Sequence, residues 1–314
     1  MNSAHAPAAA NLARPPDALP GFHDEAARER YFAAYDAALS EWPVPYQALD
    51  IATSLGTTHV IASGPADAPP LLLLPSFAGT ALAWRLNVAE LSRHYRTYAV
   101  DVIGQAGKSW TPRRLRDRHE YARWLSDLLD GLGVQRTSIV GCSFGAFLAL
   151  NQASLTPDRV ERVVMISPVG TFASQWWKLT YSARIKRPIV TWLRRVSGRQ
   201  RAPSMADLGM RPRDTVWSGL MAVTMRSFSA VTVINPPVFG RRELRAIRAP
   251  ALLLIGDAER LYSAQAMLDL ARKRMPALQG AVVAGADHIA AMAQPEDVDG
   301  RILRFLQTGA NRPA

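Results

Sequence analysis

Cysteine is nearly absent from this sequence: Cys142 stands alone among 314 residues. A single thiol excludes an intramolecular disulfide framework and fits a reducing compartment. Cys142 ends a short β-branched run, where cysteine usually serves as a small core hydrophobe. We therefore assign it no catalytic role.

Long apolar runs are also missing, although 48% of the residues are hydrophobic. No stretch approaches the roughly 18 residues that a membrane-spanning helix needs. The segment Met1–Ala10 has neither a basic start nor a Leu-rich core, so it does not resemble a secretory signal. We expect a cytoplasmic protein without a membrane span, a disordered leader over residues 1–21, and one large core with an insertion.

Acidic residues are scarce in one region only. The formal net charge is +11, and residues 170–249 hold fifteen Lys/Arg against three Asp/Glu, while the rest of the chain is nearly neutral. Such a basic surface either keeps the protein soluble or steers an anionic substrate or acidic carrier domain toward the site. No nucleic-acid-binding motif accompanies it, so we do not expect a nucleic-acid partner.

The most informative stretch runs from Thr137 to Leu150, where a strand pattern changes abruptly to a helix pattern. Gly141 and Gly145 flank Ser143 at the change, in the order Gly-Cys-Ser-Phe-Gly. A serine on such a tight strand-to-helix turn is pushed out of the sheet edge, and the flanking glycines let the two backbones pass closely. Ser143 is the candidate nucleophile.

The pattern of the remaining chain alternates between strands and helices. Leu71–Leu74 is an uninterrupted apolar run between prolines, as in a strand buried on both faces of a parallel sheet. The predicted strands cover residues 46–53, 57–63, 71–74, 97–102, 137–142, 160–167, 251–256 and 279–284. The predicted helices cover residues 24–42, 119–132, 264–274 and 295–306, with one more after Ser143.

The motif around Ser143, in this context, resembles the α/β-hydrolase family. The stretches 42–45, 58–65 and 95–101, with the glutamate-bearing loop after residue 256, are most similar to bacterial carboxylesterases of the naproxen-esterase kind. This resemblance implies a mostly parallel eight-stranded sheet flanked by helices. Residues 22–169 and 250–314 would form that core, and residues 170–249 a helical cap inserted after the sixth strand.

A serine nucleophile needs a base, and the base needs a carboxylate that holds its tautomer. Among the six histidines only His288 follows Ser143, and its Gly-Ala-Asp-His context resembles the family's histidine loop. The family places its acid three residues after the glycine that ends the preceding strand, which is Glu259 here. Asp257, one residue after that glycine, is the alternative.

The resemblance also implies an oxyanion hole built from two backbone N–H groups, those of Phe77 and Phe144. The chain departs from the family where Pro75-Ser76 replaces the usual His-Gly. Ser76 must then avoid a positive φ or bear strain, and its hydroxyl is either a loop group or a contributor to the site. For Asp101, which begins a turn of the form D-x-x-G-x-G-x-S, the family implies a structural role.

Together these features predict a serine hydrolase that cleaves carboxylic esters without a cofactor or metal. The substrate would be a small ester or acyl compound, either neutral or anionic, and the sequence does not determine the oligomeric state. One alternative is a thioesterase or acyltransferase acting on an anionic or carrier-bound acyl group. The other is a non-catalytic ligand-binding protein on the same scaffold, which the missing His-Gly pair would suit.

Overall fold

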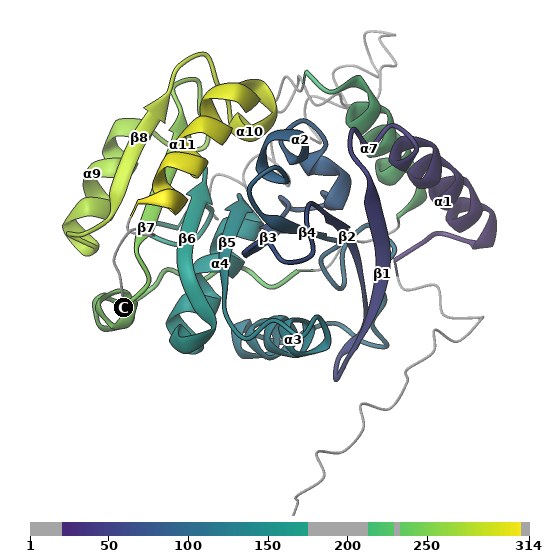
Figure 1. Cartoon of the computed structure of the whole chain (residues 1–314), viewed down its shortest axis with the longest axis horizontal. Helices are drawn as coiled ribbons and strands as arrows, with labels where there is room; N and C mark the ends of the chain where they lie inside the picture. Colours follow the sequence, from purple (N-terminus) through teal and green to yellow (C-terminus); the bar gives the residue numbers. More distant parts are fainter. Residues whose placement is uncertain (1–20, 175–212, 229–232, 309–314) are drawn as a thin grey trace, which may run out of the picture.

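The computed structural model describes residues 21–174, 213–228 and 233–308 (Figure 1). At its centre lies an eight-stranded sheet in the order β1-β2-β4-β3-β5-β6-β7-β8. β2 pairs antiparallel with β1 and β4, and every other neighbouring pair is parallel. The sheet is therefore eight-stranded and mostly parallel, as predicted. The strands are β1 (Tyr46–Thr53), β2 (Gly56–Ser63), β3 (Pro70–Leu74), β4 (Arg96–Val100), β5 (Thr137–Cys142), β6 (Val160–Ile166), β7 (Ala251–Gly256) and β8 (Gln279–Val283).

Helices flank the sheet on both faces and connect the parallel strands. The α-helices are α1 (Glu25–Leu39), α2 (Val88–Leu91), α3 (Arg118–Gly131), α4 (Phe144–Leu155), α7 (Thr215–Ser227), α8 (Arg241–Ala246), α9 (Ala264–Arg274), α10 (Ala290–Ala293) and α11 (Pro295–Gln307). The described ranges also contain the short 3₁₀ helices η1 (Ala81–Trp84) and η2 (Pro157–Arg159).

Most predicted boundaries agree with the structure to within one residue, and the clearest difference is at the end of α1. The predicted helix reached Trp42, but α1 ends at Leu39. Pro43 disfavours the helical conformation for the residue before it, so the chain leaves the helix early. Trp42 instead packs into the core and its indole Nε1 donates to Ser63 Oγ at 3.1 Å.

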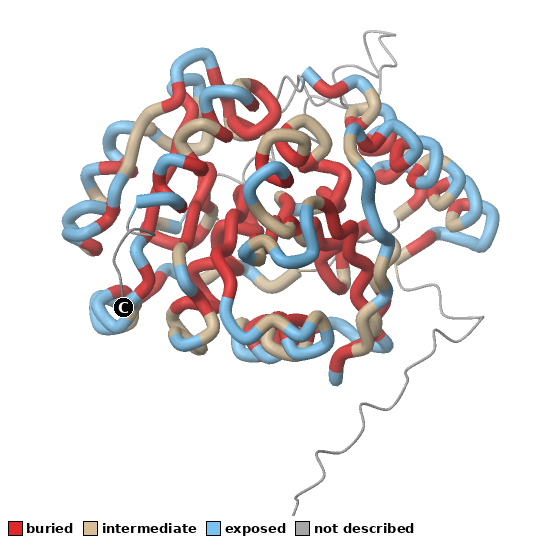
Figure 2. Tube along the Cα trace, in the orientation of Figure 1, coloured by how far each residue is buried: buried red, intermediate tan, exposed pale blue. Residues whose placement is uncertain are grey.

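The sheet separates two apolar cores, because successive side chains of a strand point to opposite faces. In β3, Leu72 and Leu74 contact the core that includes α3, α4 and α9, while Leu71 and Leu73 contact the core under α2 and α11. The central strands are accordingly buried, whereas exposed residues concentrate on the outer sides of the helices (Figure 2). This double burial explains the unbroken apolar run seen in the sequence.

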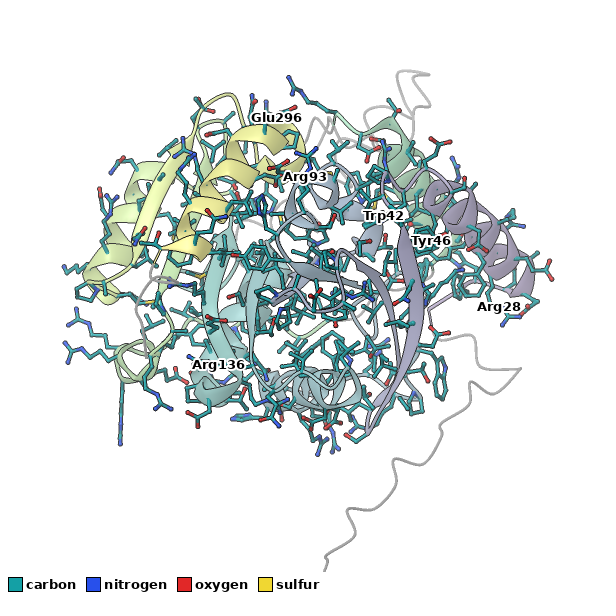
Figure 3. All side chains as sticks on the ribbon, viewed as in Figure 1. Arg28, Trp42, Tyr46, Arg93, Arg136 and Glu296 are labelled. Atoms are coloured by element: carbon teal, nitrogen blue, oxygen red, sulfur yellow. The ribbon has the colours of Figure 1, made fainter. Side chains whose placement is uncertain are left out.

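The N-terminal helix α1 packs along α7, far from it in sequence, beyond the β1 edge of the sheet (Figure 1). Phe22 forms an isolated antiparallel β-bridge with Phe228, the residue after α7. The ring of Tyr31 packs edge-on against the ring of Phe228, with 5.0 Å between their centroids. Figure 3 labels Arg28 in the first turn of α1, and Trp42 and Tyr46 where the chain enters β1. α7 is thus anchored to α1 as well as to the sheet domain.

The predicted domain boundaries concern residues of which the structure describes only a part. The predicted leader lies outside the described residues except for Gly21, and so does most of the predicted cap, namely residues 175–212 and 229–232. The described parts of residues 170–249 carry α7 and α8. Across the described ranges, no helix is long and apolar enough to cross a membrane.

Candidate functional site

Ser143 occupies the turn between β5 and α4 with a backbone conformation that serine rarely adopts, φ 53° and ψ −108°. The two flanking glycines make this turn possible. A Cβ on Gly141 would lie 2.1 Å from the carbonyl oxygen of Gly145, and one on Gly145 would lie 2.2 Å from that of Leu74. No side chain fits at either position, which agrees with the reason predicted for the motif.

The loop after β8 brings His288 to this serine. His288 Nε2 lies 2.9 Å from Ser143 Oγ, and His288 Nδ1 lies 2.6 Å from Glu259 Oε2. A carboxylate at Nδ1 favours the tautomer with its proton there, which leaves Nε2 as an acceptor facing the serine hydroxyl. Serine, imidazole and carboxylate therefore form one continuous chain of hydrogen bonds.

The side chain of Glu259 is buried, and its two carboxylate oxygens have separate partners. Oε2 faces His288, while Oε1 accepts from the backbone N–H groups of Arg260 and Leu261 at 2.8 and 2.9 Å. Burial by itself raises the pKa of Glu259, but the hydrogen bond and charge of His288 and these two amides outweigh burial and leave that pKa below its ordinary value. The group is thus an ionised carboxylate at neutral pH.

The loops that carry the acid and the histidine are held against each other. The amide of Ala258 donates to the carbonyl of Ala286 at 2.9 Å, and that of Asp257 donates to Val283 at 3.0 Å. A Cβ on Gly256 would lie 2.2 Å from the oxygen of Ala286, so only glycine permits this crossing. The separation between Glu259 and His288 is consequently fixed by backbone contacts.

Asp257, the alternative acid, has a different partner. Its Oδ2 accepts from the backbone N–H of Gly285 at 3.0 Å, which braces the start of the histidine loop. The structure thus brings Glu259, and not Asp257, to the imidazole of His288.

The loop after β3 carries Phe77 and adopts a tight turn. Gly79 N–H donates to the carbonyl of Ser76 at 2.9 Å, and Ala78, the third residue of the turn, has φ 57°. A positive φ at the third position alone is the feature of a type II turn, which usually has glycine there. Ser76 is not among the residues with positive φ, so the strain expected for the missing glycine falls on Ala78 instead.

The two amides predicted to form an oxyanion hole are both available for a ligand. Phe144 is the first residue of α4, where a helical N–H has no intrahelical acceptor. Within the described part of the chain, neither the Phe144 nor the Phe77 amide donates a backbone or side-chain hydrogen bond. Phe77 itself is 48% exposed, which is unusual for a phenylalanine.

Cys142, next to Ser143, is buried in the apolar core under α2 and α11. Burial, with smaller contributions from the charges of Glu259 and Asp287, raises the pKa of its thiol to about 12. A thiol that stays protonated is a poor nucleophile, in agreement with the role of core residue inferred from the sequence.

Sequence reasoning missed the residues that α7 brings to the site. Trp217 and Met221 of α7 form an apolar cluster with Ala83 and with Ile289 and Met292, which lie one and four residues after His288. No sequence motif marks these residues, because the fold brings them together from segments more than sixty residues apart in the chain. The only local signal is the helical spacing of the two α7 side chains.

An ion pair fixes the start of α7 at the same place. Arg85, which follows η1, makes two hydrogen bonds of 2.9 Å to the carboxylate of Asp214. Asp214 is buried and also caps α7 by accepting from the amides of Val216 and Trp217. α7 is therefore tied to the segment that follows the Phe77 loop.

Gln105 is a second functional candidate that the sequence did not single out. Its side-chain oxygen accepts from the backbone N–H of Ala78 at 2.7 Å, directly beside Phe77. The sequence analysis recognised the turn after β4 that contains Gln105, but it gave a role to Asp101 alone.

No group of three or more His, Cys, Asp or Glu side chains is positioned to hold a metal ion within residues 21–174, 213–228 and 233–308. The absence of a metal requirement stays a prediction.

Comparison with known proteins supplies an independent line of observation. Residues 71–300 match the model of the family described as the alpha/beta hydrolase family. Carboxylesterase YbfK of Bacillus subtilis is 34% identical over 284 residues, which cover 89% of this chain and 94% of that protein. The crystal structure of naproxen esterase (carboxylesterase NP) from Bacillus subtilis superposes with a TM-score of 0.75 and 31% identity, covering 89% of this chain and 98% of that one. That of carboxylesterase CesB (YbfK) from the same species gives a TM-score of 0.76 and 32% identity, covering 90% and 99%.

Proposed function

Because this chain belongs to the alpha/beta hydrolase family, we propose that it cleaves carboxylic esters through an acyl-enzyme formed on Ser143, with His288 as base and Glu259 as its acid partner. The predicted family and fold are confirmed, and the chain is a carboxylesterase-like hydrolase. The roles of individual residues are our proposal, and they rest on the geometry of the site.

In the first half of the reaction, Ser143 Oγ attacks the acyl carbon while His288 Nε2 takes the hydroxyl proton. The carbonyl oxygen gains negative charge, which the N–H groups of Phe77 and Phe144 stabilise. The bond to the alkoxy oxygen then breaks, and His288 returns the proton to that oxygen. The products of this half are the free alcohol and an acyl group bound to Ser143.

In the second half, water takes the place of the alcohol. His288 removes a proton from water, and the hydroxide oxygen attacks the acyl carbon to form a second oxyanion held by the same two amides. The bond to Ser143 Oγ breaks as His288 returns the proton to the serine. Glu259 orients the imidazole throughout and stabilises its positive charge without itself accepting a proton.

One observation carries this proposal: the uninterrupted path from Ser143 Oγ to His288 Nε2 at 2.9 Å and from His288 Nδ1 to Glu259 Oε2 at 2.6 Å. A protein that only binds a ligand has no chemical need for these three groups in this order. The hydrogen-bonded order of these groups therefore favours catalysis over the non-catalytic alternative.

Turnover of a short p-nitrophenyl ester by the wild type and by Ser143→Ala tests the proposal. We expect measurable turnover by the wild type and a loss on the order of 10³-fold or more in the variant. Equal rates in the two proteins, or no turnover by a folded wild type, would contradict it.

The apolar cluster around Trp217 and Met221 supports a further part of the proposal, that residues 170–249 form a cap over the site. These side chains of the insertion lie against Ile289 and Met292, beside the histidine. Ligands of α/β proteins bind at the carboxyl ends of the strands, and Ile289 and Met292 follow the carboxyl end of β8. The side chains of α7 would then help to decide which acyl or alcohol group enters.

A second candidate activity is thioester hydrolysis or acyl transfer with an anionic or carrier-bound acyl group. The surplus of twelve positive charges in residues 170–249 favours it. The densest part of that surplus, residues 184–201, lies outside the described residues. Under this alternative, kcat/KM for an acyl-CoA thioester falls steeply as salt rises, because ions screen charges beyond about 8–10 Å, while a neutral ester responds little. A flat response for both substrates leaves ester hydrolysis as the activity.

A further inference from the structure

The turn after β4 supports the loop that holds Phe77. Two of its side chains accept hydrogen bonds from the backbone of that loop: Asp101 Oδ1 from Ala81 N–H and Gln105 Oε1 from Ala78 N–H, both at 2.7 Å. Asp101 Oδ2 also accepts from the amide of Lys108 at 2.6 Å, which closes the turn on itself. The Phe77 loop is therefore held at two amides by one buried element.

Gln105 accepts its hydrogen bond from Ala78, the residue of the loop with the strained backbone. Ala78 has φ 57° at the third position of its turn, whereas alanine prefers the type I form with negative φ there. The two forms differ by a flip of the central peptide, which joins Phe77 to Ala78. Since Gln105 accepts the N–H of that same peptide, it stabilises the form that alanine alone disfavours. It thereby fixes the backbone of Phe77 on its carboxyl side.

The environment of Gln105 Nε2 also indicates that the hydrogen bond to Ala78 is the reason for an amide at this position. Gln105 is 5% exposed, and within the described residues its Nε2 is buried without a hydrogen-bond partner. A buried unpaired N–H lowers stability, so packing does not account for an amide at this position. The opposite amide orientation would place two donors against each other at Ala78. The hydrogen bond to Ala78 is the interaction that explains the residue.

We propose that Gln105 is a positioning residue for the oxyanion hole: it holds the peptide after Phe77 so that the Phe77 N–H remains directed at the substrate oxygen. This proposal rests on the proposed ester hydrolysis. Gln105 touches no reacting atom, so its removal should weaken transition-state binding and leave ground-state binding nearly unchanged.

The test compares Gln105→Met with Gln152→Met in the full-length protein. Gln152 is also buried, also makes one hydrogen bond, from its Nε2 to Ser126 Oγ, and also has an unpaired atom, but it lies toward the end of α4. kcat and KM are measured with a short p-nitrophenyl ester, and Ki with a trifluoromethyl ketone, which forms an oxyanion on the serine. Thermal unfolding is followed in parallel.

For Gln105→Met we expect kcat to fall on the order of 10-fold or more, somewhat less than the loss of a direct oxyanion donor. KM should change by less than about twofold, and Ki for the ketone should rise by a factor similar to the loss in kcat. The melting temperature should change little, because the variant also removes the unpaired Nε2. Gln152→Met should leave kcat and Ki at wild-type values.

Equal kcat and Ki in the Gln105→Met and wild-type proteins overturn the proposal, as does a rise in KM with Ki unchanged. If Gln105→Met does not fold, Gln105→Asn replaces it, since the shorter amide withdraws the acceptor from Ala78, and it must show the same joint change in kcat and Ki. A wild type that neither hydrolyses the ester nor binds the ketone instead overturns the proposed function. The two failures are thus distinguishable.

Discussion

Glu259 presents one carboxylate oxygen to His288 Nδ1 at 2.6 Å, while the backbone amides of Arg260 and Leu261 hold the other. The acid therefore cannot rotate away from the imidazole without losing two hydrogen bonds. Asp257, two residues earlier, is bonded to Gly285 instead. This difference turns the choice between the two acids into a measurable prediction.

Glu259→Gln should lower kcat on the order of 10²-fold or more, because the amide no longer stabilises the protonated imidazole and permits the wrong tautomer. Asp257→Asn, the matched control, should change kcat far less, since it alters only the brace on Gly285. Steady-state kinetics with one ester suffices. A larger loss in Asp257→Asn would move the role of the acid to Asp257.

Gly145→Ala should destabilise the protein and abolish most of its activity. The added Cβ would lie 2.2 Å from the carbonyl oxygen of Leu74, so the backbone of the turn between β5 and α4 must shift. We expect a cost of roughly 1–3 kcal/mol in the free energy of unfolding, as for overpacking of a core. Urea unfolding and ester turnover measure the two effects.

Gly219→Ala is the control for this experiment. Gly219 lies in α7, and apart from its chain neighbours and the backbone of its own helix, no atom of the described residues lies within 4 Å of the added Cβ. The variant should therefore gain about 0.5–1 kcal/mol of stability from helix propensity. An unfolding free energy that falls equally in both variants would refute the close contact between Gly145 and the carbonyl oxygen of Leu74.

Asp299 should make stability depend on pH. Burial raises the pKa of this carboxyl to about 8, although a hydrogen bond from Asn87 at 2.8 Å opposes the shift. The folded state thus binds the proton more tightly than the unfolded state, whose carboxyl has its ordinary pKa of 3.8. The resulting stability is complete below that value and is lost as pH rises toward about 8.

Asp299→Asn removes this titration. The unfolding free energy of the variant should therefore rise relative to the wild type by about 2 kcal/mol or more between pH 5 and pH 8, given a limit of about 1.4 kcal/mol per pH unit. Urea unfolding at several pH values gives both curves. Parallel curves would contradict the elevated pKa of Asp299.

Local patterns in the sequence predicted the individual strands and the two glycines of the turn at Ser143, while the family resemblance implied the architecture of the sheet and the candidate acid. Gly141 and Gly145 stand where two backbones nearly touch, and Glu259 follows Gly256 at the spacing typical of the family. Each of these features involves residues that are only a few positions apart in the chain. A local motif can therefore reveal each one.

The features that the sequence did not reveal depend on contacts between distant segments. The strain of the Phe77 loop falls on Ala78, and it is stabilised by Gln105 from another turn. The pairing of Arg85 with Asp214 likewise joins segments more than a hundred residues apart. Periodicity and spacing describe one segment at a time, so they cannot predict which side chains the fold brings together.

The nucleophile itself can be identified by covalent labelling. Wild type and Ser143→Ala are incubated with a fluorophosphonate probe, and intact masses and peptide maps are recorded by mass spectrometry. We expect a single adduct on Ser143 in the wild type and none in Ser143→Ala, because only a serine activated by His288 and facing an oxyanion hole reacts readily. An unlabelled but folded wild type, or an adduct on another residue that persists in Ser143→Ala, would contradict it.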